Sequence, residues 1–110
     1  VLDQTGLKLS DIDVIEFHEA FAGQILANLE ALRSRKFAEK IGLSAPVGDM
    51  DMSKFNTLGG SLSIGHPFGA TGTRLLTTAA NRLEREQGQF ALVAACAAGG
   101  QGHAIILERI

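Results

Sequence analysis

The chain has 110 residues, of which 45% are hydrophobic and 20% charged, a size and composition typical of one soluble globular domain. Its net charge of −2, with no basic cluster stronger than Arg33, Arg35 and Lys36, argues against binding to nucleic acid or to an anionic membrane. The longest apolar run, FALVAACAA, is about half of a membrane-spanning helix, so we expect no transmembrane segment, and the single cysteine excludes an internal disulfide.

The first predicted elements are a strand and a helix. Residues 14–17 form a short apolar run that is typical of a buried strand. Between residues 20 and 33, apolar side chains recur at spacings of three and four, which predicts an amphipathic helix. Residues 34–53 are mixed in character and are broken by glycine and proline, so we expect a surface connection there.

The second half of the chain predicts another helix followed by a β-hairpin. A glycine-rich stretch at 59–72 precedes a helical pattern that includes Leu75 and ends at Gly88. The runs 89–96 and 103–109 are strand-like, and the glycines between them favour a hairpin. With one further strand between the helices, the order is β-α-β-α-β-β. This order predicts an α/β fold with helices packed on a mixed sheet.

His66 is the first candidate for chemistry, because its neighbours restrict its direction. Pro67 disfavours helical geometry at His66, and the surrounding glycines allow backbone or a ligand to come close. A helix is predicted just after it, which places free N–H groups near the imidazole. The alternative is a histidine held in a tight turn by hydrogen bonds to backbone.

Cys96 is the second candidate, because it ends a predicted strand beside a loop that contains Gly99, Gly100 and Gly102. Main-chain N–H groups in such a loop can point at an anion, and a reactive thiol needs an electropositive, partly exposed setting. The alternative is an inert core cysteine. If His66 lies at the same edge of the sheet, a functional pair becomes the better interpretation.

Other polar residues have simpler interpretations. His18, next to Glu19, could cap the following helix or donate a hydrogen bond to a ligand oxygen. We expect His103 to lie inside the last strand and to pack in the core or against a partner, and the charges from Arg82 to Glu86 to form a solvated helix face. The histidine and cysteine spacings match no common zinc site, and the glycines match neither a dinucleotide-binding motif nor a P-loop.

Three motifs stand in order along the chain: HEAF at 18–21, GHPFGATG at 65–72 and CAAGGQG at 96–102. Together they resemble the C-terminal half of thiolases over essentially the whole chain, and they are most similar to the thiolase (β) subunits of fatty-acid β-oxidation complexes. Many thiolases have Asn at the position of His18 and a more glycine-rich loop after the cysteine. The resemblance implies a thiolase C-terminal domain over residues 1–110, as a fragment of a longer chain.

The resemblance implies a reaction: cleavage of a 3-ketoacyl-CoA by CoA to acetyl-CoA and a shortened acyl-CoA. Cys96 matches the catalytic cysteine that acts as acid and base. His66 matches the histidine that activates the nucleophilic cysteine and helps to polarise the thioester oxygen in an oxyanion hole. His18 matches the residue that holds a water in the same oxyanion hole. The backbone N–H of Ala98 matches a donor of the second oxyanion hole, and Phe21 matches a residue that lines the pantetheine channel. The nucleophilic cysteine belongs to an N-terminal half that this chain does not contain.

The resemblance also implies partners and a location. The substrates are 3-ketoacyl-CoA and CoA, with no other cofactor and no metal. Thiolases are homodimers or dimers of dimers, and those of β-oxidation complexes pair with a hydratase–dehydrogenase (α) subunit, in the bacterial cytoplasm or the mitochondrial matrix. Two alternatives remain at this stage. One is a non-catalytic half-thiolase that serves as a CoA-binding or assembly module, and the other is a biosynthetic acetoacetyl-CoA thiolase.

Overall fold

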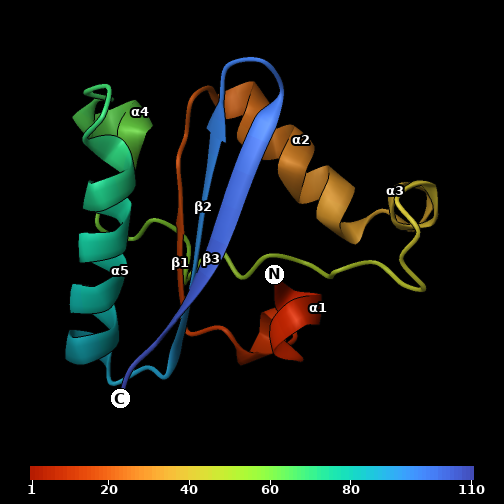
Figure 1. Cartoon of the computed structure of the whole chain (residues 1–110), viewed down its shortest axis with the longest axis horizontal. Coiled ribbons are helices and arrows are strands. Elements are labelled where there is room, and N and C mark those ends of the chain that lie inside the picture. Colours follow the sequence, from red (N-terminus) through yellow and green to blue (C-terminus); the bar gives the residue numbers. More distant parts are fainter.

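The computed structural model describes all 110 residues. In chain order its elements are α1 (Leu2–Thr5), the 3-10 turn η1 (Leu9–Asp11), β1 (Val14–Phe17), α2 (Ala22–Arg33), α3 (Arg35–Lys40), α4 (Ser61–Ile64), α5 (Thr71–Glu86), β2 (Phe90–Ala97) and β3 (Gln101–Glu108). Figure 1 shows the strands at the centre, with α5 on one side of them and α1, α2 and α3 on the other.

The three strands form one mixed sheet in the order β1-β2-β3. β1 runs parallel to β2, with Phe17 opposite Ala94. β2 and β3 form the antiparallel hairpin that the glycine loop predicts, with Cys96 opposite Gly102. Parallel neighbours need a long crossover, and here it contains α2 to α5. The predicted α/β class with a mixed sheet is confirmed.

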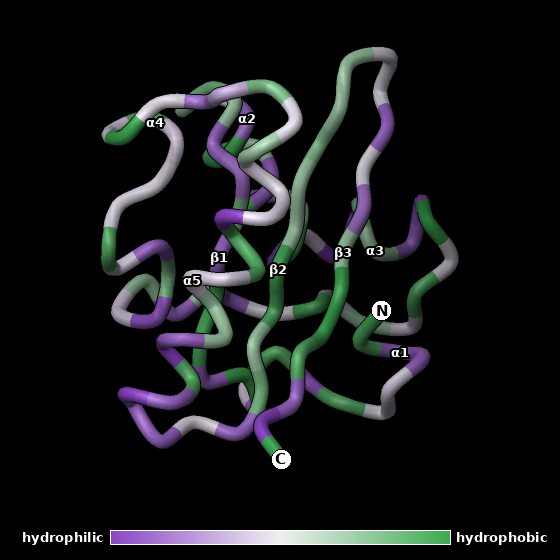
Figure 2. The backbone as a smooth tube through the Cα atoms, turned by 60° about the vertical axis from the view of Figure 1, so that its left-hand side comes forward, coloured by the Kyte–Doolittle hydropathy of each residue, from purple (hydrophilic) through white to green (hydrophobic).

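Each face of the sheet carries its own apolar core, because successive side chains of a strand point to opposite faces. On one face, β1 and β2 pack against α5 through Val14, Leu75, Ala79, Leu83, Ala91 and Val93. On the other face, Ile15, Phe17 and Leu92 pack with Leu9, Ile12, Ile25 and Phe55. Figure 2 shows mostly hydrophobic residues along the strands. The tip of the β2–β3 hairpin is paler in colour and extends beyond the helices.

A buried ion pair crosses the interface between α5 and the sheet. Arg82 is 1% exposed, and its Nη1 donates to Glu16 Oε1 at 2.9 Å and to the Lys54 carbonyl at 3.0 Å. Its Nε also donates to Glu86 Oε1 at 2.7 Å. The prediction of a solvated helix face is therefore wrong for Arg82. Burial raises the pKa of Glu16 even though Arg82 and Arg74 act to lower it.

The segment between the two long helices differs from its prediction in two ways. Residues 34–53 include the helix α3, whose first turn is capped by Ser34 accepting a hydrogen bond from the Phe37 N–H at 3.2 Å. The strand expected between the helices is reduced to a single parallel bridge between Ile15 and Phe55. No helix is both long enough and apolar enough to cross a membrane.

Candidate active site

The site lies at the carboxyl ends of the two parallel strands. His18 directly follows β1, and its backbone N–H donates to the Ala94 carbonyl of β2 at 2.8 Å. Cys96 lies near the end of β2, two residues beyond Ala94. His18 and Cys96 therefore reach the same edge of the sheet, and they line one cavity of about 420 Å³ together with Gln24 and Asn28 of α2. Ligands of α/β sheets bind outside this kind of edge.

His66 joins this edge from the link between α4 and α5. Its ring lies 4.1 Å from the ring of His18, centroid to centroid, with 41° between the two planes. His18 thus has His66 against its ring and shares its cavity with Cys96. The structure brings together the three side chains that the sequence singled out.

The partners of His66 favour one tautomer. Its Nδ1 lies 2.6 Å from the hydroxyl of Thr71, at the start of α5. The Thr71 hydroxyl has an acceptor of its own, the Pro67 carbonyl at 3.4 Å, so it can accept a hydrogen bond from His66 Nδ1–H. This arrangement leaves Nε2 of His66 with a free lone pair, as a general base requires.

His18 has a different environment from His66. It is 6% exposed, and its Nδ1 lies 2.8 Å from the Ser61 hydroxyl. Burial lowers the pKa of His18, and the charges of His66 and Arg74 lower it further, whereas Glu19 acts to raise it. The lowered pKa favours the neutral ring of His18, and a neutral imidazole still has one N–H to donate to a developing oxyanion.

Neither His18 nor Glu19 caps α2, so that alternative is wrong. The residue before this helix is Phe21, and no side chain caps it. Glu19 instead accepts hydrogen bonds from Asn56 Nδ2 at 2.8 Å and from the Leu62 N–H in the first turn of α4 at 3.1 Å. A Cβ on Gly60 would lie 2.0 Å from Glu19 Oε2, so a side chain at this position would displace the Glu19 carboxylate.

Cys96 is half-buried, and its thiol donates to Gln24 Oε1 at 3.4 Å. The hairpin turn that follows contains Ala98, whose N–H takes part in no backbone hydrogen bond. Gly99 and Gly100 have φ values of 90° and 74°, which favour glycine, and a Cβ on either would meet open space. The loop therefore presents free backbone donors next to Cys96, the setting that the sequence predicts.

Two further predictions have different outcomes. Phe21 is 74% exposed at the start of α2 and does not line the Cys96 cavity. His103 lies in β3, as the sequence predicts, but it is exposed and lines that cavity opposite Ala95, so packing in the core is wrong. Packing against a partner stays a prediction. No three His, Cys, Asp or Glu side chains are close enough together to hold a metal ion.

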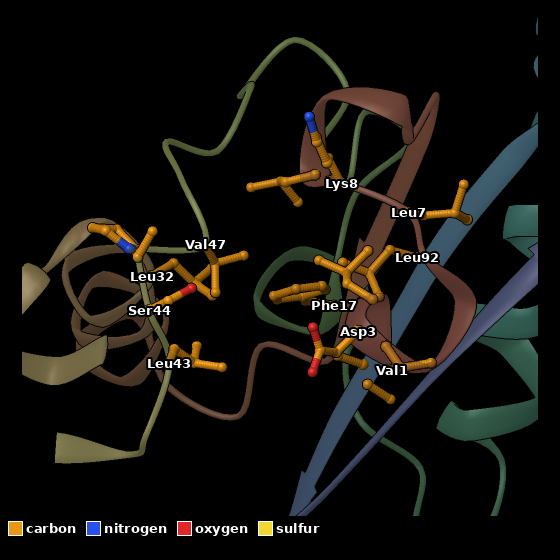
Figure 3. A pocket seen from close by; sticks show the side chains of 16 residues that line it. Val1, Asp3, Leu7, Lys8, Phe17, Leu32, Leu43, Ser44, Val47 and Leu92 are labelled. Carbon is orange, nitrogen blue, oxygen red and sulfur yellow. The ribbon is translucent and has the colours of Figure 1, made fainter. Parts of the chain in front are cut away.

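A second cavity, of about 430 Å³, lies on the other side of β1 and β2 from α5. There Phe17 and Leu92 of the sheet face Leu32, Leu43 and Val47 (Figure 3). Its lining is mostly hydrophobic and includes none of the predicted site residues. The predicted site residues His18 and Cys96 line the other cavity instead.

Sequence reasoning did not identify several side chains that hold this edge together: Thr71, Ser61, Arg74, Gln24 and Asn56. One of them left a signal. Arg74 precedes the buried Leu75 by one residue and follows the buried Thr71 by three. A cation at that helical spacing, next to the apolar stripe of α5, indicates a charge directed toward the interior.

The fold and the site together define a class of protein. Residues 1–109 match the family described as "Thiolase, C-terminal domain". The chain belongs to the thiolase family, as the resemblance of the three motifs indicated.

Individual proteins show which members of the family the chain is similar to. The chain is 64% identical over 109 residues to the mitochondrial trifunctional enzyme subunit beta of Bos taurus, covering 98% of this chain and 23% of that protein. It is 56% identical to the 3-ketoacyl-CoA thiolase of Shewanella frigidimarina over 97% of this chain and 25% of the relative. The human mitochondrial 3-ketoacyl-CoA thiolase in complex with CoA has a TM-score of 0.77 and 35% identity, over 100% of this chain and 24% of that one. The chain thus spans about a quarter of the length of these relatives.

Proposed function

We propose that the chain is the C-terminal catalytic domain of a degradative 3-ketoacyl-CoA thiolase. It would cleave a 3-ketoacyl-CoA with CoA to give acetyl-CoA and a shortened acyl-CoA, in fatty-acid β-oxidation. The observation that carries this proposal is the meeting of His66, His18 and Cys96 at one sheet edge, with a ring distance of 4.1 Å between the histidines. The complete enzyme would also contain an N-terminal half with the nucleophilic cysteine.

The first half-reaction transfers the acyl group to the enzyme. Nε2 of His66 accepts the proton of the nucleophilic thiol, and the thiolate attacks the C3 carbonyl of the substrate. The C2–C3 bond then breaks, and its electron pair stays on C2 of the departing acetyl-CoA. The Cys96 thiol donates its proton to that carbon, which leaves Cys96 as a thiolate and the shortened acyl group on the nucleophile.

The second half-reaction returns the enzyme to its starting state. The Cys96 thiolate accepts the proton of the incoming CoA thiol, and the CoA sulfur attacks the acyl-enzyme thioester. The shortened acyl-CoA leaves, and the released thiolate of the nucleophilic cysteine takes back the proton that His66 Nε2 accepted in the first half-reaction. One group therefore serves as acid and then as base, which is why it must lie beside C2 of the departing acetyl-CoA and then beside the thiol of the incoming CoA.

Negative charge develops on a carbonyl oxygen in each half-reaction, and donors that are already in place stabilise it. Removing one such donor costs roughly 10²–10³ in rate. His18 Nε2–H, through a water, and His66 serve the first oxyanion, and the Ala98 N–H serves the oxyanion near Cys96. Phe21 lines the pantetheine channel. CoA is a co-substrate, and no further cofactor is needed for these steps.

The same proposal covers assembly and location. The bovine relative's name, a trifunctional enzyme subunit beta, supports pairing with an α subunit. We propose that this subunit carries hydratase and dehydrogenase activities and that the thiolase itself is a homodimer or a dimer of dimers. The bovine relative is named as mitochondrial and another relative is bacterial. These names support the mitochondrial matrix or the bacterial cytoplasm as the location.

The experiment that tests the function is thiolysis by the complete protein that contains this chain. With a 3-ketoacyl-CoA and CoA, we expect acetyl-CoA and the shortened acyl-CoA in equal amounts. His66→Ala should lower kcat by about 10²–10⁴, because the general base is lost. Wild-type protein that binds CoA without forming acetyl-CoA would contradict the proposal and favour a non-catalytic CoA-binding module.

A further inference from the structure

We propose that Ser61 and Arg74 are positioning residues that hold His18 as a neutral imidazole with its proton on Nε2. This inference rests on the proposed function, because it explains how His18 presents a hydrogen-bond donor to the first oxyanion hole. Neither residue touches the reacting atoms. Both act through His18.

The hydrogen-bond chain determines where the protons lie. Arg74 Nη2 lies 3.1 Å from the Ser61 hydroxyl, and that hydroxyl lies 2.8 Å from His18 Nδ1. Arginine can only donate, so the Ser61 oxygen accepts from Arg74. The hydroxyl has one proton, and His18 Nδ1 is the only acceptor within reach. Ser61 therefore donates to Nδ1, and the proton of the neutral ring is on Nε2.

The opposite tautomer leaves a proton without a partner. If His18 Nδ1–H donated to Ser61, the oxygen would accept two hydrogen bonds and its own proton would have no acceptor. Ser61 is 7% exposed and His18 is 6% exposed, so water cannot readily take that role. Because Ser61 and His18 are both buried, the direction of their hydrogen bond determines the tautomer of His18.

Two of the three charges around His18 also favour its neutral ring. Arg74 lies on α5 and His66 on the link between α4 and α5, and both disfavour a second proton on His18. Glu19, which follows His18 in the chain, opposes them, while burial of His18 is the largest influence and also favours the neutral ring. Arg74 itself is near the buried Glu16, whose pKa it acts to lower.

The contacts of Arg74 support this positioning role. Its only hydrogen bond within the chain is the one to Ser61, and its buried Nε and Nη1 have no partner. Arg74 is half-buried, and two buried guanidinium nitrogens without a partner are costly, so packing alone does not explain its place. Ser61 is in the first turn of α4 and Arg74 in the first turns of α5, the helices that flank His66. The two helices that flank His66, the general base, therefore also orient His18, the hydrogen-bond donor.

The test is a double-mutant cycle in the complete thiolase. Ser61→Ala should lower kcat about tenfold with KM within about twofold, because one hydrogen bond to His18 is lost. In a His18→Ala background, Ser61→Ala should have no further effect, since its action passes through His18. The matched control is Ser63→Ala, on the same helix, whose hydroxyl bonds only the Gly60 carbonyl. The control should keep wild-type kcat.

The pH dependence gives a readout that a purely structural role would not move. Arg74→Gln removes the cation, so the pKa of His18 rises. As the pH falls, the ring of His18 then becomes protonated at a higher pH than in the wild type. The titration of His18, followed by NMR of its ring protons, should therefore shift to higher pH in Arg74→Gln and stay in place in Arg74→Lys. Rates are compared per folded protein, measured by thermal unfolding, and the Ser61 cycle decides alone if Arg74→Gln does not fold.

The outcomes separate this inference from the proposed function. If the wild type is active and His18→Ala is slow, but Ser61→Ala equals Ser63→Ala, the positioning role is wrong and the thiolase function stands. Additive losses in the Ser61→Ala, His18→Ala pair would equally overturn it. A wild-type protein without thiolysis would instead refute the function on which the inference rests.

Discussion

Arg82→Met tests the buried ion pair that joins α5 to the sheet. The substitution keeps a long unbranched side chain but removes the cation that bonds Glu16 Oε1 at 2.9 Å and the Lys54 carbonyl at 3.0 Å. Breaking a buried pair typically costs 3–5 kcal/mol. Glu16 already has a raised pKa and can become neutral, so the lower end, about 3 kcal/mol, is expected.

Urea unfolding followed by far-ultraviolet circular dichroism measures this change, since the chain has no Trp or Tyr to report by fluorescence. With a slope of about 1.5 kcal/mol per molar urea, the midpoint should fall by about 2 M. The control is Arg85→Met, an exposed cation on the same helix, which should change stability by less than about 0.5 kcal/mol. Adding Glu16→Gln to Arg82→Met should restore part of the loss, because no charge then remains buried. A midpoint within error of wild type for Arg82→Met would refute the reasoning.

Three further predictions concern neighbouring features. Gly60→Ala should lower stability by about 1–3 kcal/mol in thermal unfolding, because a Cβ 2.0 Å from Glu19 Oε2 displaces that carboxylate, whereas Gly23→Ala in open space on α2 should be neutral or stabilising. Because the folded pKa of Glu16 is raised, stability should fall as pH rises from its ordinary value of 4.5 through the folded value, and Glu16→Gln should lack this slope in pH-dependent urea titrations. Thr71→Val should lower kcat of the complete thiolase about tenfold, since His66 Nδ1 loses its partner, and an unchanged kcat would contradict that role; the exposed Thr73→Val is the control.

The sheet and the place of the site were predictable because their signals are local. The apolar run at 14–17 and the two runs around the glycine loop give β1 and the β2–β3 hairpin from periodicity alone. His18 and Cys96 each follow or end such a run. The carboxyl ends of parallel strands meet at one edge, so their proximity follows from the order of elements.

The contacts that orient the site were not predictable, because they join residues far apart in sequence. Ser61 is 43 positions from His18, and no periodic pattern links a serine on a one-turn helix to an imidazole after a strand. Arg82 opens a run of charges that ends at Glu86, a pattern typical of a solvated helix face. Its place on the stripe of Leu75 and Ala79 was the stronger signal, since that stripe faces the core.

The measurement that tests the central claim most directly is the rate of thiolysis by the complete protein with Cys96→Ser. A serine hydroxyl has nearly the size of the thiol but does not exchange protons near pH 7, so the acid and base steps fail. The account predicts a kcat reduced by about 10²–10⁴ with substrate binding retained. Near-wild-type thiolysis by this variant would contradict the role of Cys96 and, with it, the catalytic assignment of this edge of the sheet.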